Sequence, residues 1–307
     1  MQQQLNTYSI YILLVLTILL SACGNLQQDI ELELPEYEPE ISVEAYLQAG
    51  QPYFLTLVKS QPYFDDIRVE YLSGATVTVS HSQGVDTLQE FNIDISDPTL
   101  GLLADTALLN TFSGIFGEQL VFYGSFQPVP TLYNEDFNLK VETLDGEQLT
   151  ATTKILPVVP IDSLVQQFND QQEAFVLTFF TDDETTTNFY RRVFEFQRLQ
   201  VDSMDNGTVD SSFVTRVDQD FITDDIVFNG QPFAFGTDFQ FEVGDTIFST
   251  LYHITEDYFD FITTRDAAVA AALSPFGQPA VLSSNINGGK GIFTGISFVR
   301  ETYVIQE

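Results

Sequence analysis

The segment DFNLKVETLDGEQLTATTKIL, residues 136–156, indicates how this chain folds. In its first eight residues, apolar Phe, Leu and Val alternate with polar Asn, Lys and Glu. Strict alternation is the pattern of a strand with one buried face. Asp145-Gly146 then supplies a dipeptide typical of a tight hairpin turn, and a second alternating run follows. The segment therefore predicts two antiparallel strands joined by a turn.

Two earlier segments show the same alternation. They are ISVEAYL (residues 41–47) and ATVTVSH (residues 75–81). Short alternating strands separated by turn residues predict a mainly β protein, with an N-terminal β-sandwich, Ig-like or transthyretin-like, over residues 41–156. The segment DPTLGLLADTALLNTFSGIFGEQLVFYG, residues 97–124, breaks the alternation. We expect a loop insertion with a little helix there.

The segment LPVVPIDSL, residues 156–164, marks the expected boundary between two domains. Pro157 and Pro160 cannot donate hydrogen bonds to a sheet, and each favours an extended conformation in the residue before it. We expect a second β-rich domain over residues 157–307. Its strands include the long run NFYRRVFEFQRLQVD, which Asn206-Gly207 turns into TVDSSFVTRV.

One amphipathic helix is expected in the C-terminal domain. Thr255 can cap its N-terminus, and the acidic residues that follow favour the positive end of the helix dipole. Ser274-Pro275 ends it. Five apolar residues keep helical spacing and form the face that we expect to be buried: Tyr258, Phe261, Ile262, Val269 and Leu273.

The charge of the chain limits the partners that it can have. It carries 44 Asp and Glu against 11 Lys and Arg, a formal net charge of −33. Because affinity for nucleic acid comes mainly from Lys and Arg, nucleic acid is not an expected partner. Since 44% of the residues are hydrophobic, the chain can nevertheless form a packed core and is not a disordered acidic protein.

The N-terminus predicts a lipid anchor. An apolar run of eleven residues, IYILLVLTILL, fits the core of a secretory signal of roughly 7–15 residues and is too short for a membrane span of roughly 20. Small residues and then Cys23 follow, and Leu20-Ser21-Ala22-Cys23 resembles a bacterial lipobox. We expect a signal peptide over residues 1–22 and acylation of Cys23, for example with palmitate.

Residues 23–40 are expected to form a tether between the lipid and the folded body. Cys23 is the one cysteine of the chain, so no disulfide is possible. Six acids and two prolines lie between Asp29 and Glu40. Their mutual repulsion and the stiffness of proline extend such a segment.

The sequence predicts no catalytic, cofactor-binding or metal-binding residue. The segment NINGGKGIFTG, residues 285–295, lacks the first glycine of a phosphate-binding loop, and we expect a glycine-rich turn before the last strand. His81 and His253 have no partners at the spacing of a zinc site or a triad, so we expect them to be structural. Calcium binding is an alternative for the acidic segments 181–188 and 202–210.

Aromatic residues leave a second alternative open. The chain has 13 Tyr and 28 Phe but no Trp. Phe mostly belongs in cores. Tyr37, Tyr53 and Tyr63 lie near prolines, and exposed rings there would allow a sugar-binding platform.

Five segments taken in order resemble a Bacteroidota outer-membrane lipoprotein family, catalogued as domain-of-unknown-function family 4249. They span nearly the whole chain after the signal: ISVEAYLQAGQPYFLTLVKSQPYF, SGATVTV, LPVVPIDSL, HITEDYFDFI and SSNINGGKGIF. Members of this family resemble accessory lipoproteins encoded near TonB-dependent, SusC-like transporters. Acids soon after the lipidated cysteine resemble a signal for the cell surface.

The resemblance implies a non-enzymatic protein in the outer membrane, without a cofactor, that binds a ligand or contacts a TonB-dependent transporter in nutrient uptake. A periplasmic position is the alternative to the cell surface. A surface hydrolase that uses paired carboxylates and a structural or adhesive lipoprotein are the other two functions that the sequence allows.

Overall fold

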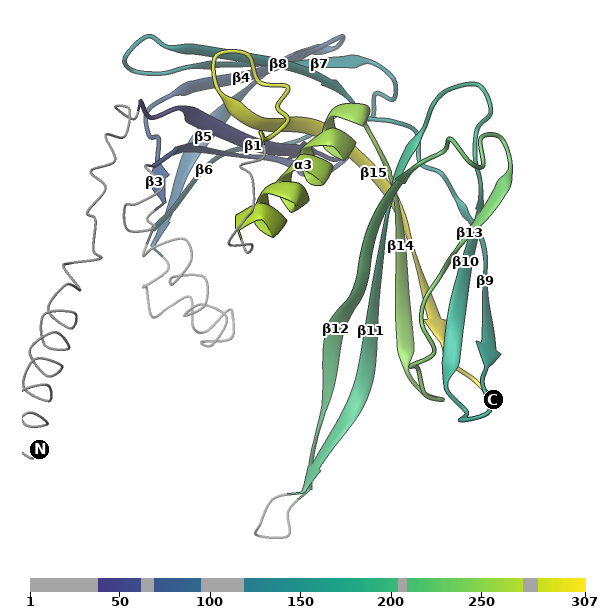
Figure 1. The fold of residues 1–307 in the computed structure, drawn as a ribbon. Coiled ribbons are helices and arrows are strands. Elements are labelled where there is room, and N and C mark those ends of the chain that lie inside the picture. Colours follow the sequence, from purple (N-terminus) through teal and green to yellow (C-terminus); the bar gives the residue numbers. More distant parts are fainter. Residues whose placement is uncertain (1–37, 62–68, 95–118, 204–208, 273–280) are drawn as a thin grey trace, which may run out of the picture. The chain divides into compact units, whose positions relative to one another are not determined.

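The computed structural model describes residues 38–61, 69–94, 119–203, 209–272 and 281–307. The chain divides into a short N-terminal unit, Met1–Glu38, and a compact unit, Pro39–Glu307. The predicted signal peptide, Cys23 and most of the tether lie outside the described residues. All that follows concerns the compact unit (Figure 1).

Strands make up most of the described chain, as predicted. A twelve-stranded sheet has the order β12-β11-β14-β15-β1-β2-β6-β5-β4-β7-β8, with β3 paired to β2 beside this path, and a second sheet has the order β13-β10-β9. The strands are β1 (Ile41–Leu47), β2 (Pro52–Lys59), β3 (Glu70–Tyr71), β4 (Thr76–His81), β5 (Gly84–Asp94), β6 (Gln119–Pro128), β7 (Asp136–Glu142), β8 (Gln148–Lys154), β9 (Ile161–Phe168), β10 (Ala174–Thr181), β11 (Phe189–Ser203), β12 (Val209–Asp224), β13 (Pro232–Gly236), β14 (Thr246–Ile254) and β15 (Lys290–Val304).

The alternating segments of the sequence form the N-terminal core. In β7 every second residue is buried, and β8 pairs with β7 through the turn at Asp145-Gly146. Gly146 has φ +86°, which suits its place in that turn. The buried faces of β1, β2, β4, β6, β7 and β8 share one cluster, so this region has the sandwich-like arrangement that the alternation predicts.

The loop insertion predicted for residues 97–124 is wrong for residues 119–124, which form a strand. Residues 97–118 lie outside the described residues, but Gln119–Gly124 are the first part of strand β6. This part of β6 pairs with β5 and carries buried Val121 and Tyr123. Because both faces of β6 are apolar, the period-two pattern that marks a half-buried strand is absent.

The last strand belongs to both halves of the large sheet. Its first part runs parallel to β1, and its second part runs antiparallel to β14 (Figure 1). Phe293 lies in the N-terminal core cluster. The domain boundary at residue 156 remains a prediction, but residues of β15 contribute to the core on the N-terminal side of it.

The parallel pairing depends on a glycine. Gly291 lies opposite Val43 and has φ +106°. A Cβ on Gly291 would lie 1.9 Å from the main-chain oxygen of Val43. Since no other residue allows this approach, the predicted glycine-rich turn serves a close contact between strands.

The predicted helix is α3 (Glu256–Ala272), and Thr255 caps it by accepting a hydrogen bond from the N–H of Tyr258 at 3.4 Å. Tyr258, Phe261 and Ile262 are buried, as expected. Val269 is 56% exposed, so its predicted place on the buried face is wrong, and Leu273 lies outside the described residues. No helix in the described part of the chain is long and apolar enough to cross a membrane.

Candidate contact surface

Four phenylalanines form a chain of ring contacts on neighbouring strands. We call Phe54, Phe91, Phe122 and Phe126 the phenylalanine ladder. The ring of Phe122 stacks on that of Phe54 at 4.9 Å and on that of Phe91 at 5.2 Å, and Phe126 meets Phe91 edge to face at 5.5 Å. Phe54 is 44% exposed and Phe126 is 85% exposed. Exposed apolar side chains that lie together in this way are a feature of interaction surfaces.

The strand register explains why these rings face outward. Tyr53, Leu55 and Leu57 point into the N-terminal core, which leaves Phe54 on the other side of β2. Phe54 lies opposite Gly124 of β6, and Phe91 lies opposite Phe122. The ladder therefore occupies one outer face of β2, β6 and β5.

Gly124 makes room for the rings. A Cβ at this position would lie 2.8 Å from the main-chain oxygen of Tyr53 and 3.4 Å from the ring of Phe122. With hydrogen there instead, the rings of Phe91 and Phe122 can pack close to the sheet.

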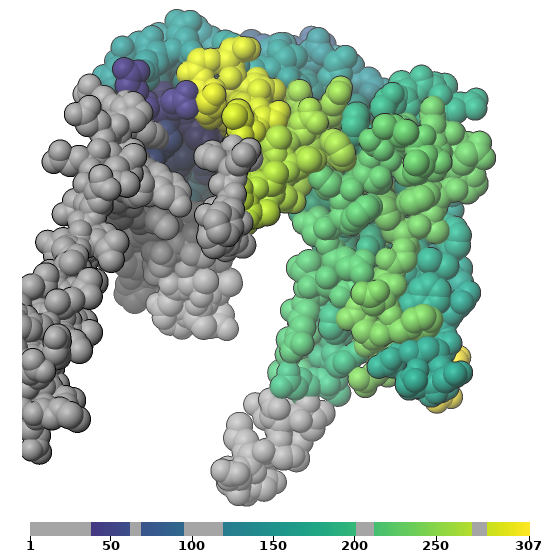
Figure 2. All heavy atoms as spheres, viewed as in Figure 1, coloured from purple at the N-terminus to yellow at the C-terminus, as the bar shows by residue number. Residues whose placement is uncertain are grey.

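Helix α3 covers the adjacent part of the same sheet face. Tyr46 of β1 faces outward, like Phe54, and its ring meets that of Tyr258 at 5.6 Å. Ile292 and Ile296 of β15 lie in one cluster with the buried side of α3. Figure 2 shows the atoms of α3 packed against those around the start of β15.

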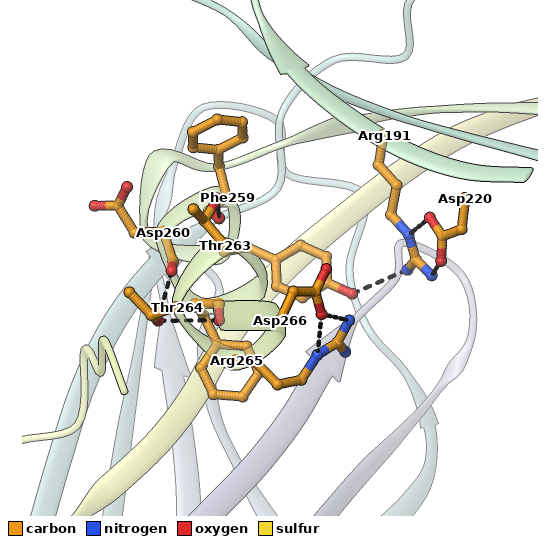
Figure 3. Close-up of polar contacts among 10 residues, drawn as sticks. Arg191, Asp220, Phe259, Asp260, Thr263, Thr264, Arg265 and Asp266 are labelled. Carbon is orange, nitrogen blue, oxygen red and sulfur yellow. Dashed lines mark hydrogen bonds and ion pairs between the residues drawn. The ribbon is translucent and has the colours of Figure 1, made fainter. Parts of the chain in front are cut away.

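Arg191 links the helix to the C-terminal strands and forms a bidentate ion pair between two of them (Figure 3). Arg191 of β11 donates from Nε and Nη2 to the two carboxylate oxygens of Asp220 on β12, at 2.7 and 2.5 Å. Its Nη1 donates to the hydroxyl of Tyr258 at 3.1 Å. The hydrogen bonds to Asp220 raise the pKa of Arg191, so this side chain remains a cation.

At the same end of β11, carboxylates lie in a buried polar cluster of Asp182, Asn188, Tyr190, Asp225 and His253. Asp182 accepts hydrogen bonds from the Tyr190 hydroxyl at 2.5 Å and from the N–H of Gly230 at 2.7 Å. Asp225 accepts one from the N–H of Asn188 at 2.7 Å. These carboxylates are used as acceptors within the chain, which is how buried polar groups are stabilised.

His253 joins this polar cluster to the segment that precedes β9. Its Nδ1–H donates to the carbonyl oxygen of Pro157 at 2.8 Å, and Nε2 lies 3.0 Å from Oδ1 of Asn188. Burial lowers the pKa of His253 below its ordinary value. Burial and the hydrogen bond to Asp182 raise the pKa of Tyr190. Both groups are therefore uncharged near neutral pH, and both ring nitrogens of His253 face other groups of the chain.

The acidic segment 181–188 contributes to the same cluster. Asp183 accepts hydrogen bonds from the N–H and hydroxyl of Thr185 at 3.0 and 2.7 Å, and these lower its pKa. Over the described ranges, no group of three or more His, Cys, Asp or Glu side chains is placed to hold a metal ion. The other acidic segment, 202–210, lies largely outside the described residues.

A buried arginine lies on the face of β11 that is opposite to Arg191. Arg192 is 2% exposed, and its guanidinium lies 4.2 Å from the ring centre of Phe194 and 5.4 Å from that of Phe235. It donates from Nη2 to Gln219, whereas Nε and Nη1 have no partner in the described part of the chain. Desolvation lowers the pKa of Arg192 to about 10, so it stays charged at neutral pH.

Ser82 and His81 lie beside a polar recess of about 410 Å³, but they do not form a catalytic pair. Ser82 donates its hydroxyl proton to Glu135. His81 accepts the N–H of Gln83 at Nδ1, at 3.3 Å, and donates from Nε2 to Asp86 at 3.0 Å. A triad requires the serine hydroxyl to bond to the imidazole, so this arrangement is structural.

The tyrosines proposed for a sugar platform do not form one around Tyr53. Tyr53 is 2% exposed and donates its hydroxyl to Asp86 at 2.6 Å, so its expected exposure is wrong. It belongs to the N-terminal core because it alternates with Phe54 on β2. Tyr37 and Tyr63 lie outside the described residues.

Sequence reasoning missed the ladder because it assigned phenylalanine to the core in general. A usable signal was present in PYFLTLVK, where Tyr53, Leu55 and Leu57 already fill one face. Phe54 then falls on the other face, where a polar residue is normal. The alignment with Phe91 and Phe122 required the strand register, which is not local information.

The chain has low similarity to two solved structures and matches one family model. It shares 10% identity and a TM-score of 0.22 with a DUF4785 family protein from Legionella pneumophila, over 69% of this chain and 52% of that one. With Salmonella alpha-2-macroglobulin it shares 8% identity and a TM-score of 0.24, over 92% of this chain and 16% of that one. No curated protein matches the chain significantly. A family model described as a domain of unknown function, DUF4249, matches residues 27–302, and the chain therefore belongs to that family.

Proposed function

We propose that this protein is a lipid-anchored accessory protein of the outer membrane that contacts a TonB-dependent, SusC-like transporter through the phenylalanine ladder. The observation that carries the proposal is the ladder itself. Its rings stack on one another although Phe54 and Phe126 remain exposed to water. Aromatic residues of this kind are enriched at protein interfaces, and their burial by a partner is favourable.

The chemistry of the described part of the chain favours contact over catalysis. The carboxylates of the buried polar cluster accept hydrogen bonds from neighbouring groups, and both ring nitrogens of His81 and the Nδ1 of His253 have partners. Catalysis by a carboxylate or an imidazole needs an atom that can reach a substrate. The exposed rings, by contrast, are available to a partner without any rearrangement.

The anchor explains how a modest contact can suffice. Acyl chains on Cys23 would confine the protein to the membrane that holds the transporter. Confinement raises the effective concentration of one partner for the other, so that a weak intrinsic affinity gives stable association. The acidic tether would give the body the reach to meet the barrel.

Purification of the tagged protein in mild detergent tests the contact. We expect the wild type to bring down a TonB-dependent β-barrel, and Phe54→Asp to lose most of it because a carboxylate would have to be desolvated in the interface. Phe213→Asp is the matched control, since Phe213 is 64% exposed on a different strand, β12. Equal recovery of the barrel with both variants, or recovery of no barrel with the wild type, would contradict the proposal.

Labelling with a fatty-acid analogue tests the anchor separately. We expect Cys23→Ala to abolish incorporation and to leave the signal peptide uncut. Label that remains in the variant would show that Cys23 is not the lipidated residue.

A further inference from the structure

Strands β5 and β6 separate at one point in the sheet and leave a fork between them. They pair from Gln89–Gly124 to Asp94–Gln119. Before Gln89, β5 pairs with β4 instead, and beyond Gly124, β6 pairs only with β2. Each strand in the fork therefore has one edge without a strand partner.

The fork holds a recess of about 350 Å³, which we call the fork recess. This volume falls in the range of small-molecule sites, about 300–1,000 Å³. One exposed aromatic ring, Phe126, stands on its rim, and the rest of the lining is almost entirely polar. The lining residues are Val85, Asp86, Thr87, Gln89, Ser125, Phe126 and Gln127.

Asp86 is held in a fixed orientation in this lining. Its Oδ2 accepts hydrogen bonds from the buried Tyr53 hydroxyl at 2.6 Å and from Nε2 of His81 at 3.0 Å. Its Oδ1 has no hydrogen-bond donor among the described residues. A carboxylate whose position is set by two neighbours is a preorganised acceptor, because it loses little freedom when a ligand binds.

The other polar groups of the fork recess complement this carboxylate. The side chains of Gln89, Gln127 and Thr87 make no hydrogen bond within the described chain, and all three are exposed. Each amide offers both donors and an acceptor, and the hydroxyl offers one donor. Together with Ser125, these residues give the fork recess four neutral polar side chains, and Asp86 adds one negative charge.

We propose that the fork recess binds a neutral saccharide. Sugar hydroxyls both donate and accept hydrogen bonds. A lining of amides, hydroxyls and one carboxylate offers acceptors and donors to match them. The apolar C–H face of a sugar ring can lie on the exposed ring of Phe126. Anionic sugars are disfavoured by Asp86 and by the net charge of −33. This inference goes beyond the contact with a transporter and does not depend on it.

Saturation-transfer NMR on the full lipoprotein, solubilised in a detergent without a sugar headgroup, tests the inference. The probes are glucose, galactose, maltose and cellobiose, with glucuronate as the anionic comparison. We expect at least one neutral probe to bind, and glucuronate to bind more weakly. Gln127→Ala should weaken binding about 3- to 10-fold, the loss of one hydrogen bond. Phe126→Ala should weaken it at least as much.

Phe126 belongs both to the ladder and to the fork recess, so the controls use residues that belong to only one of them or to neither. Gln119→Ala removes an exposed glutamine at the far end of β6 and should leave binding unchanged. Phe54→Asp should keep saccharide binding while it loses the transporter, and Gln127→Ala should do the reverse. Absence of binding by every neutral probe, binding that survives both Gln127→Ala and Phe126→Ala, or preference for glucuronate would each overturn the inference.

Discussion

Helix α3 covers one part of an outer sheet face, and no helix among the described residues covers the adjacent part. Over β1 and β15, the helix buries Ile292 and contacts the partly buried ring of Tyr46. Over β2, β6 and β5, the same face carries the phenylalanine ladder, with Phe126 85% exposed. Both parts are apolar, so the difference lies in what covers them and not in the kind of residue.

This difference separates stability from function. Side chains under α3 contribute to folding, because their apolar surface leaves water when the chain folds. The exposed ladder side chains gain much less from folding, and their remaining apolar surface is available for a partner. Substitutions in the two parts should therefore affect different measurements.

Disruption of the pairing between β1 and β15 should have the largest effect on stability. Gly291→Ala would place a Cβ 1.9 Å from the main-chain oxygen of Val43 and disrupt the pairing of β1 with β15. We expect the free energy of unfolding to fall by at least about 4 kcal/mol, or the protein not to fold. Gly50→Ala is the control, because Gly50 has φ +78° but open space around it. That variant should lose about 1–2 kcal/mol, measured by urea denaturation.

A pair of phenylalanine truncations tests the comparison directly. Phe261→Ala, on the buried side of α3, should lower the free energy of unfolding by about 3–5 kcal/mol. Phe54→Ala, in the ladder, should lower it by about 1 kcal/mol because 44% of the side chain is already exposed. Similar losses for the two variants would mean that the ladder serves the fold and not a partner.

The stability that the buried polar cluster contributes should depend on pH. Burial lowers the pKa of His253, so the folded chain takes up its proton at lower pH than the unfolded chain does. Stability from the neutral form is complete above the ordinary pKa of about 6.5 and is lost as the pH falls below it. We expect the thermal midpoint of the wild type to fall relative to that of His253→Gln between pH 7 and pH 5. Parallel curves for the two proteins would show that the proton of His253 is not linked to folding.

The ion pair between Arg191 of β11 and Asp220 of β12 should have the smallest effect. Asp220→Asn removes the charge from the bidentate contact with Arg191, but the Asp220 side chain is 40% exposed. Screening by solvent limits the loss to about 0.5–1 kcal/mol in the free energy of unfolding. Asp266→Asn, in the exposed pair with Arg265, is the control and should change it by less than about 0.5 kcal/mol. A larger loss for Asp266→Asn would reverse the roles that we assign to the two pairs.

Local patterns in the sequence predicted the strands with one polar face and the capped helix. Residues 136–142 alternate because one face meets water, and Thr255 precedes the helix because its hydroxyl accepts an N–H. Strand β6 was missed because both of its faces are apolar. The pairing of Val43 with Gly291 joins segments far apart in the chain, and no local pattern encodes it.

Neither the ladder nor the fork recess could be predicted from local sequence, because each depends on which strands pair and in which register. Phe54, Phe91 and Phe122 meet only because β2, β6 and β5 are neighbours in one register. The fork recess exists because β5 changes partner at Gln89. From composition alone, we assigned phenylalanine rings to the core. The position of each ring on its strand instead puts the ladder on the outer face of the sheet.

Photo-crosslinking in cells tests most directly whether the ladder is the surface that meets the transporter. A crosslinking residue in place of Phe54 should form adducts with a TonB-dependent β-barrel. The same residue in place of Leu144, which is 81% exposed on the β7–β8 turn, should form few. Barrel adducts from position 54 in clear excess over position 144 are the result that we predict. Equal adducts from both positions, or barrel adducts from position 144 alone, would contradict the account.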